Sequence, residues 1–547
     1  MRRTDARALA LALACVLGCL GTGAAAARAD THVNADPPAG IVPTTMTLQE
    51  LLASHAKAVG DASRFHSDVE EGDIVEYGIK GTYRAVWSKH DGWRESVQLG
   101  VLSYQSGKVN GQHWRQNENG QVIALHDVHP ENAISEDAIS KAAPTTAGGV
   151  RLMGEVAFPF PAYVVEINPK GGRHEWRFYD KQNYLLERTE AIYPTRRAVT
   201  TYSDFHTVQG ITEAWHVHES DGHPQNDADW AVRRDTFDAA VSAHDLEAPP
   251  NNAGLVQFPT GKRSLSIPVR IVNSKVIVRL QIGGRGLDFF LDSGASGIAI
   301  DTGIAHQLGL QPLGREIATT AGVYEASRSL IPEIRIGDLV MHNVVVESLP
   351  FTSDPDEQTR SVGLLGFDFI SNAALTIDYQ HSTLVATQPG FFIPPADAIA
   401  LEALLDDGVP YISAQVGNAI GTHFILDTGA AGALIYSSFA SAHPDDVKDE
   451  GKGGLFNRNY PFLRGSGVGG ELRLKAIEVK SFALGGINFQ DWLMYQTVEN
   501  PGFESEDNDG LIGYDLLRYF TLYLDYHDSR VYLQPNDLLK HNSAAGR

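Results

Sequence analysis

Cysteine is almost absent from this sequence. Among 547 residues there are two cysteines, Cys15 and Cys19, and both lie within the first twenty positions. From there on the chain offers no disulfide, no thiol nucleophile and no cysteine-ligated metal site. Disulfide scaffolds, cysteine proteases and zinc-ribbon proteins are therefore excluded for nearly the whole chain.

Positive charge and long apolar runs are also scarce. There are 44 Lys and Arg against 67 Asp and Glu, which gives a formal net charge of −23. Because nucleic acids are polyanions, this charge disfavours a nucleic-acid partner. After residue 29 no apolar run reaches the roughly 20 residues that a membrane-spanning helix needs, so we expect no transmembrane span there.

The first segment is typical of an export signal. Residues 1–29 contain a basic stretch, MRRTDAR, an apolar stretch, ALALALACVLG, and a small-x-small sequence, ARA, before Asp30. We therefore expect a signal peptide and a bacterial protein that is periplasmic or secreted. The sequence VLGC, which ends at Cys19, resembles a lipoprotein cleavage box, so lipoprotein anchoring stays open as the alternative.

The next region predicts a β-rich domain. Residues 30–46 are polar and rich in proline, and we interpret them as a linker. Thr47 and Glu50 form the sequence pattern of a capping box, apolar residues follow at helical spacing, and Gly60 ends the pattern. Alternating strands with Asn-Gly and Asp-Gly turns come next. Residues 47–258 are thus predicted to be an N-terminal accessory domain, one helix with a large antiparallel sheet.

An internal repeat begins after a LEAPPNN segment that predicts a boundary between separate units. The first copy contains FLDSGASG, GLLGFDF and LTIDYQ, and the second contains ILDTGAAG, GLIGYDL and LYLDYH in the same order. The 12 positions from Gly366 to Asp378 recur from Gly513 to Asp525. Agreement of several linked features predicts a duplicated lobe.

The repeat also decides which Asp-Ser/Thr-Gly triplets are equivalent. Asp292-Ser293-Gly294 aligns with Asp427-Thr428-Gly429. The same offset places Asp301, which begins a third triplet, on Tyr436, so Asp301 has no counterpart. We predict that Asp301 is a helix N-cap rather than a catalytic residue.

The aligned triplets resemble those of aspartic proteases. Each is followed by alanine, Ala295 and Ala430, which is closer to the retropepsin-like branch than to the pepsin-like one. The resemblance implies a mainly β fold of two β-barrel lobes related by a pseudo-twofold axis. The lobes are residues 264–390, called lobe 1 here, and residues 398–540, called lobe 2. Since one chain contains both, we expect a monomer.

The chemistry of such proteases needs two carboxyl groups. Two carboxylates within about 3 Å of each other cannot both ionise, so the pair keeps one proton. One group can then take a proton from water while the other donates a proton to the peptide carbonyl. We expect Asp292 and Asp427 to be this catalytic pair, and Gly294 and Gly429 to let the two carboxyls approach.

The resemblance implies further roles near the cleft. The hydroxyls of Ser293 and Thr428 would link the two catalytic loops. The segments ATTAGVYEASRSL and LRGSGVGGELRL would form hairpins over the cleft, with Gly322, Tyr324 and Gly467 as flap candidates. An exposed hairpin tyrosine is the alternative for Tyr324.

The N-terminal region has a resemblance of its own. HEWRFYDKQNYLLERTEAI and TTYSDFHTVQGITEAWHVH resemble the periplasmic lipoprotein-carrier and outer-membrane lipoprotein-sorting family. That family implies a curved, half-barrel-like sheet with an acyl chain or lipoprotein as partner. An accessory domain for another ligand and an inhibitory prosegment both stay open. His216 and His218 share a strand face, but their spacing fits no metallohydrolase motif, so we expect no metal and no cofactor.

The sequence thus predicts an exported aspartic peptidase whose substrates are peptides or proteins. The alternative is a non-catalytic peptide- or lipid-binding module on an aspartic-protease fold. Both triplets are intact, which favours catalysis, because a non-catalytic descendant has no need to keep both carboxylates.

Overall fold

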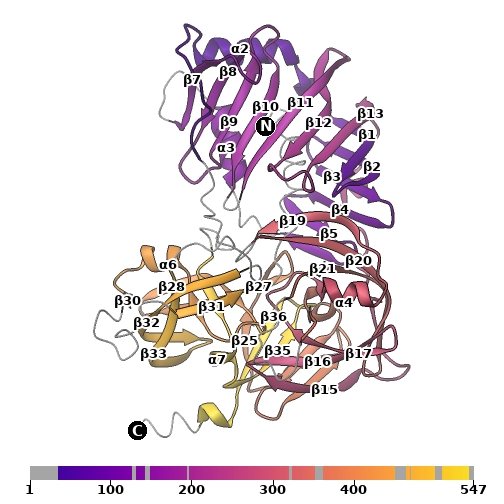
Figure 1. Ribbon diagram of the computed structural model, residues 1–547, viewed down its shortest axis with the longest axis vertical. Coiled ribbons are helices and arrows are strands. Elements are labelled where there is room, and N and C mark those ends of the chain that lie inside the picture. The colour runs from indigo at the N-terminus through magenta and orange to yellow at the C-terminus, as the bar shows by residue number, and fades with distance from the viewer. Residues whose placement is uncertain are drawn as a thin grey trace.

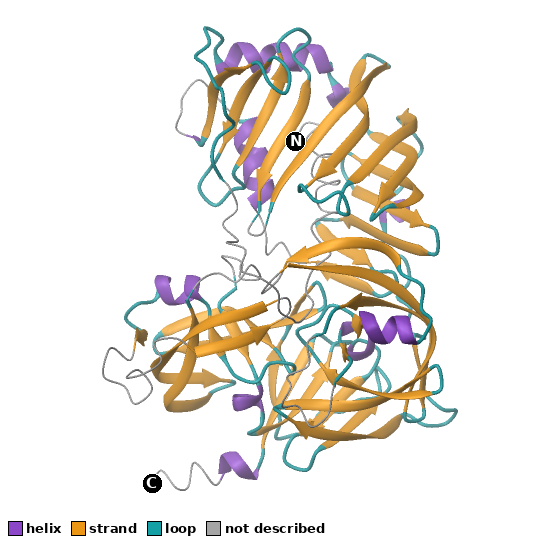
Figure 2. Ribbon diagram, in the orientation of Figure 1, coloured by secondary structure: helices purple, strands orange, loops and turns teal. Residues whose placement is uncertain are grey.

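The computed structural model describes residues 35–125, 131–141, 148–193, 196–319, 323–351, 361–449, 463–467, 470–498 and 508–540. The predicted signal peptide lies outside them. The described part is mainly β, as the sequence predicts, with one large sheet above two β-rich lobes (Figure 1; Figure 2). None of its helices is long and apolar enough to cross a bilayer.

The region before the repeat forms one open antiparallel sheet of 13 strands. Their order is β6-β5-β4-β3-β2-β1-β13-β12-β11-β10-β9-β8-β7, so only the β1–β13 pairing joins strands that are distant in sequence. The sheet curls into a half-barrel (Figure 1). The strands are β1 (Ser67–Glu76), β2 (Ile79–Ser88), β3 (Gly92–Leu99), β4 (Leu102–Val109), β5 (Gln112–Gln116), β6 (Val122–Leu125), β7 (Val150–Val156), β8 (Ala162–Ile167), β9 (Glu175–Asp180), β10 (Leu186–Ile192), β11 (Arg197–Val208), β12 (Ile211–Ser220) and β13 (Ala228–Phe237).

Helices pack against this sheet. In α2 (Leu48–Val59) the predicted capping box is confirmed: the Thr47 hydroxyl accepts from the Glu50 N–H at 3.2 Å, and the Glu50 carboxylate accepts from the Thr47 N–H at 2.9 Å. Gly60 ends the helix with a φ of +88°. The sequence does not predict α3 (Glu131–Ser140), because its polar sequence has no continuous apolar stripe and packing against the sheet stabilises it instead. Two single-turn 3₁₀ helices are η1 (Ala62–Arg64) and η3 (Ala243–Leu246).

The repeat folds into two lobes with matching elements. A short strand, β14 (Val256–Gln257), precedes lobe 1 and pairs with β21. Lobe 1 contains β15 (Ser264–Val272), β16 (Lys275–Ile282), β17 (Arg285–Leu291), β18 (Ile298–Asp301), α4 (Thr302–Gln307), β19 (Leu313–Thr319), β20 (Val323–Ile336), β21 (Leu339–Leu349), β22 (Gly363–Leu365), α5 (Phe367–Ile370), β23 (Ala374–Asp378) and β24 (Thr383–Thr387). Lobe 2 contains β25 (Ile399–Glu402), β26 (Leu404–Asp406), β27 (Val409–Val416), β28 (Ala419–Leu426), β29 (Leu434–Ile435), α6 (Ser437–Ala442), β30 (Val447–Asp449), β31 (Leu463–Gly467), β32 (Gly470–Leu484), β33 (Ile487–Thr497), β34 (Gly510–Ile512), α7 (Tyr514–Leu517), β35 (Phe520–Asp525) and β36 (Arg530–Pro535).

The two lobes are related by a pseudo-twofold axis. Strands β23 and β35 are equivalent in the repeat, and they pair antiparallel in a sheet that both lobes share. Thr376 pairs with Tyr523. These two residues are equivalent in the repeat, because Thr376 lies as far after Gly366 as Tyr523 lies after Gly513. The residues on either side pair reciprocally, so the pairing is symmetric about this point.

Partly buried polar contacts join the N-terminal sheet to lobe 1. In the β5–β6 turn, the Asn119 side chain accepts from the Val345 N–H and donates to the Val345 carbonyl, both at 2.8 Å. In the β12–β13 loop, Asn226 holds the backbone of Ile317 in the same way, at 2.6 and 2.8 Å. Ile123 of β6 belongs to the apolar core of the lobes. The LEAPPNN segment is therefore not what alone connects the N-terminal sheet to lobe 1, because these side-chain contacts join them as well.

Candidate active site

The two aligned triplets meet where the lobes join. They follow β17 and β28, and a Cβ atom placed on Gly294 would lie 3.1 Å from Asp427 Oδ2. A Cβ atom placed on Gly429 would lie only 2.7 Å from Asp292 Oδ2. Any side chain at either glycine would therefore displace the opposite carboxyl. The structure brings Asp292 and Asp427 together, and their side chains hydrogen-bond to each other.

The hydroxyl groups of the triplets cross-link the two loops. Ser293 Oγ donates to the Leu426 carbonyl at 2.7 Å and accepts from the Thr428 N–H at 3.0 Å. Thr428 Oγ1 donates to the Leu291 carbonyl and accepts from the Ser293 N–H, both at 3.0 Å. Both side chains are buried. Each hydroxyl thus binds backbone of the opposite lobe on both sides of that lobe's aspartate, which fixes the separation of the two carboxyls.

The Gly-apolar-apolar-Gly segments pass beside the loops. The Asp292 N–H donates to the Leu365 carbonyl at 2.9 Å, and the Asp427 N–H donates to the Ile512 carbonyl at 3.0 Å. In both lobes the segment pairs parallel with the strand that carries the triplet. The aspartates are therefore anchored from their backbone as well as through the hydroxyl cross-links.

The two carboxyls differ in their surroundings. Burial raises the pKa of both groups, and the charge of Asp427 raises the pKa of Asp292 further. Asp292 accepts from one backbone group, the Gly294 N–H at 2.9 Å, whereas Asp427 accepts from the Gly429 and Ala430 N–H groups at 2.7 and 3.1 Å. The ionised form is therefore better stabilised at Asp427, and the pair as a unit keeps a proton.

Two tyrosines that the sequence analysis passed over lie beside this pair. Tyr379 and Tyr526 follow β23 and β35 and are equivalent in the repeat. Each ring contacts an aromatic ring of the other lobe: Tyr526 lies 6.1 Å from Phe367 and Tyr379 lies 5.6 Å from Tyr514, centroid to centroid. Burial and the two aspartate charges raise the pKa of Tyr526, so its hydroxyl stays protonated. The repeated Asp-Tyr pair is the sequence signal that could have found them.

The flap segments form hairpins in both lobes. β19 pairs with β20, and β31 pairs with β32, while the tips of both hairpins lie outside the described residues, Gly322 included. Tyr324 is buried, 6% exposed, in an apolar cluster with Phe290 and Ala295, so the alternative of an exposed tyrosine is wrong. Gly467 ends β31 opposite Gly470. A role for these residues over the cleft stays a prediction.

The third triplet is confirmed as a helix start. Asp301 is the N-cap of α4, and its Oδ1 accepts from the Ile304 N–H at 3.0 Å. Its Oδ2 accepts from the Phe351 N–H at 3.1 Å, so both oxygens are used for structure. In lobe 2 the equivalent Tyr436 precedes α6.

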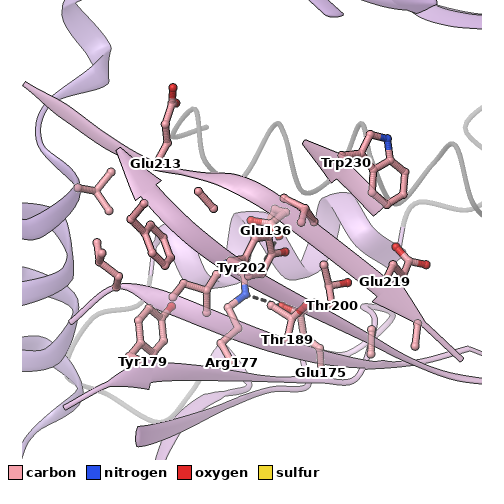
Figure 3. Close-up of a pocket in the computed structure, with 18 of the residues that line it drawn as sticks. Glu136, Glu175, Arg177, Tyr179, Thr189, Thr200, Tyr202, Glu213, Glu219 and Trp230 are labelled. Atoms are coloured by element: carbon pink, nitrogen blue, oxygen red, sulfur yellow. Dashed lines mark hydrogen bonds and ion pairs between the residues drawn. The ribbon is translucent and has the colours of Figure 1, made fainter. Parts of the chain in front are cut away.

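A separate hollow lies in the N-terminal region. It has a volume of about 1420 Å³, part of it open to solvent, and is bounded by the sheet and by residues of α2 and α3. Figure 3 shows Arg177 inside it, where its guanidinium contacts Glu136 and donates to Glu175 Oε1 at 2.7 Å. Tyr202 and Trp230 supply aromatic surface. The wall of this hollow is mainly apolar but contains buried charge.

The histidines weighed as metal ligands have other partners. His216 and His218 both contact Asp229 Oδ1, at 3.2 and 3.0 Å. His223, which lies a few residues further along the chain, contacts Asp221 Oδ1 at 3.2 Å. In the part of the chain that the structure describes, no group of three or more His, Cys, Asp or Glu side chains is arranged to hold a metal ion.

A pair of buried aspartates on symmetric, cross-linked loops between two β lobes resembles the site that the sequence analysis expects of an aspartic protease. Comparison with protein-family models agrees with this assignment for lobe 1. Residues 278–369 match the aspartyl protease family, and this match includes Asp292. A search of curated proteins gave no match.

Solved structures also resemble this chain. Three of them are a domain assigned to the outer membrane lipoprotein-sorting proteins from Vibrio parahaemolyticus, a DUF1329 family protein from Desulfovibrio piger and a LolA superfamily protein from Nitrosomonas europaea. Their identities are 9%, 12% and 10%, and each TM-score is 0.27. The similarity covers 37%, 36% and 37% of this chain, and 95%, 97% and 98% of those chains.

Proposed function

We propose that this protein is an exported aspartic peptidase that hydrolyses peptide bonds by activating water between Asp292 and Asp427. The observation that carries the proposal is the hydrogen-bonded pair of buried carboxyls, held at fixed separation by the Ser293 and Thr428 hydroxyls. The match of lobe 1 to the aspartyl protease family supports a peptidase-type activity.

The proposed reaction follows from the different surroundings of the two carboxyls. Ionised Asp427 takes a proton from a water molecule as the water oxygen attacks the peptide carbonyl carbon. Protonated Asp292 donates its proton to the carbonyl oxygen, which gives a neutral tetrahedral diol. Proton transfer to the amide nitrogen and cleavage of the C–N bond then release an acid and an amine, and Asp292 is protonated again.

The setting of this activity is part of the proposal. The signal-peptide pattern in residues 1–29 and the absence of a predicted span after it favour a periplasmic or secreted enzyme. Both triplets lie in one chain, so the site is complete in a monomer. The substrate class is a peptide or protein, and no cofactor takes part.

The test is hydrolysis of a diverse peptide library by the full chain, with and without a pepstatin-type statine inhibitor. We expect cleavage that the inhibitor blocks. Asp292→Asn and Asp427→Asn should each abolish it, because either change removes the shared proton. Asp301→Asn is the matched control: it gives up the hydrogen bond from the Phe351 N–H but keeps both catalytic carboxyls and the helix cap, since Asn caps helices about as well as Asp, so it should keep nearly full activity. Full activity in both dyad variants would contradict the proposal.

A ligand role for the N-terminal region has support of its own. The hollow against the curled sheet has mainly apolar walls, and the paired Arg177 offers polar contacts to one end of a ligand. We propose an acyl chain, free or on a lipoprotein, as its occupant. Titration with a fluorescent fatty acid should give saturable binding that Trp230→Arg, which fills the hollow with charge, removes. A library assay without cleavage, combined with such binding, would favour the non-catalytic module instead.

A further inference from the structure

The repeat places an aspartate at the start of one short helix in each lobe. Asp368 in α5 and Asp515 in α7 are equivalent, and both follow the Gly-apolar-apolar-Gly segment. In lobe 2 the carboxylate is used within the lobe: Asp515 Oδ1 accepts from the Ala433 N–H at 2.9 Å and from the Leu516 N–H at 2.8 Å. Ala433 lies in the loop that follows the catalytic triplet. Asp515 therefore ties α7 to this loop.

In lobe 1 the equivalent carboxylate receives its hydrogen bonds from outside the lobe. Asp368 Oδ1 accepts from Asn117 Nδ2 at 2.8 Å, and Asp368 Oδ2 accepts from Asn119 Nδ2 at 2.9 Å. Both asparagines belong to the β5–β6 turn of the N-terminal sheet. The residue equivalent to Ala433 is Ile298, which pairs with Leu365 in the sheet. In lobe 1 the donors to the equivalent carboxylate come from the N-terminal region instead.

The helix that carries Asp368 touches the catalytic loop directly. The Phe367 N–H donates to the Ala295 carbonyl at 2.9 Å. A Cβ atom on Gly366 would lie 2.1 Å from the Gly297 carbonyl oxygen, so α5 and the loop are in close contact. A Cβ atom on Gly297 would lie 3.4 Å from Asp368 Oδ2. Because packed contacts of this kind do not yield freely, displacement of α5 would displace the loop of Asp292.

The β5–β6 turn is itself held firmly. Asn117 Oδ1 accepts from the Asn119 N–H at 3.1 Å and from the Gln121 N–H at 2.9 Å. Gln121 Oε1 accepts from Asn372 Nδ2 at 2.7 Å, which adds a second contact with the residues just after α5. Asn119 is also bound to Val345 of β21. These contacts therefore fix the orientation of the Asn117 and Asn119 side chains, whose amide groups donate to Asp368.

We propose that Asn117 and Asn119 are positioning residues for the catalytic loop of lobe 1, so that the N-terminal region completes the active site. The inference rests on the proposed peptidase function. Asp368 is 2% exposed, and a buried carboxylate without hydrogen-bond donors is costly. The two amides stabilise its charge and hold α5 against the loop of Asp292.

The test is an exchange of the two interacting groups in the full chain. Asn117→Asp places two carboxylates against each other, and Asp368→Asn places two amides against each other. In the double variant the amide of residue 368 donates to the carboxylate of residue 117 and still accepts from Asn119. Both hydrogen bonds are thereby restored, and only the one between residues 117 and 368 has its direction reversed. Asn488→Asp, at an exposed position of β33, is the control for the change of charge.

The first readout is hydrolysis of a fluorogenic peptide that the library assay selects. We expect kcat to fall about 10- to 100-fold in each single variant with KM little changed, because a small displacement of a catalytic group affects the chemical step. The double variant should recover to within about threefold of the parent, since the coupling is local to the pair. Single variants with parental kcat, or a double variant no better than the worse single one, would overturn the proposal.

The second readout does not need activity. Hydrogen exchange measured by mass spectrometry should be about tenfold faster in residues 292–298 of each single variant and should return to the parental rate in the double variant. Residues 427–433 of lobe 2 serve as the internal reference and should not change. If the parent cleaves no peptide, the proposed function fails while exchange still decides the positioning role. If the parent cleaves and exchange in 292–298 is unchanged, the positioning role fails alone.

Discussion

Replacement of Thr428 by valine tests the cross-link between the catalytic loops most directly. Valine keeps the shape of threonine, so little cavity forms and the lost hydroxyl is the main change. Thr428 is buried, and its Oγ1 donates to the Leu291 carbonyl and accepts from the Ser293 N–H. Both backbone groups then lose a partner whose side chain is buried.

The expected magnitude follows from these two groups. A buried polar group left without a partner costs about 1–3 kcal/mol, so Thr428→Val should lower the free energy of unfolding by about 2–6 kcal/mol. For a unit of some 150–250 residues, 1 kcal/mol corresponds to about 2–4 °C in Tm. The Tm of the lobes should therefore fall by about 5–20 °C.

Thermal unfolding followed by circular dichroism and peptide hydrolysis measure the two consequences. Thr428→Ser is the matched control: it keeps the hydroxyl and should stay within about 1.5 kcal/mol of the parent, the cost of one lost methyl group. Ser293→Ala removes the mirror-image pair of bonds and should resemble Thr428→Val. The reasoning is refuted if the valine variant unfolds within 1 °C of the serine variant, since the hydroxyl would then contribute nothing.

Three further predictions concern pH and assembly. Because alanines follow both triplets, no side-chain hydroxyl at Ala295 or Ala430 stabilises the ionised pair; we expect maximal hydrolysis at a pH on the order of 5 to 6, and a downward shift when both become threonine. An optimum below about 3 in the parent would contradict this. Specific activity should not change on dilution, because one chain holds both lobes; a second-order loss would show a site built between chains. Burial, with the charges of Glu76 and Glu70, raises the pKa of Glu95 to about 8. Glu95 therefore destabilises the folded state in a pH-dependent way. This destabilisation is absent below the unfolded-state pKa of about 4.3 and grows as pH rises toward 8, because the folded state keeps a proton that the unfolded state releases. Glu95→Gln should then raise Tm at pH 8 and not at pH 4, and equal effects at both would exclude this cause.

Local pattern in the sequence was enough to predict the symmetric part of the molecule. The duplicated lobes, the alignment of Asp292 with Asp427 and the N-cap role of Asp301 all follow from comparing one copy of the repeat with the other. The capping box at Thr47 and Glu50 follows from four neighbouring residues. These features depend on short segments whose conformation is set by their own turns, caps and alternation.

Tertiary structure alone decided how the parts act on each other. Asn119 lies in an Asn-Gly turn, and the sequence indicates only that turn, whereas its side chain binds residues of lobe 1 that lie more than 200 positions away. Asp368 and Asp515 occupy equivalent positions but have different partners, since the β5–β6 turn reaches Asp368 whereas Asp515 is bound by backbone of its own lobe. Helix α3 forms by packing against the sheet rather than from its own propensity. A hydrogen bond between distant residues leaves no periodic trace in a single sequence, because its geometry exists only once both elements have been placed by the apolar core.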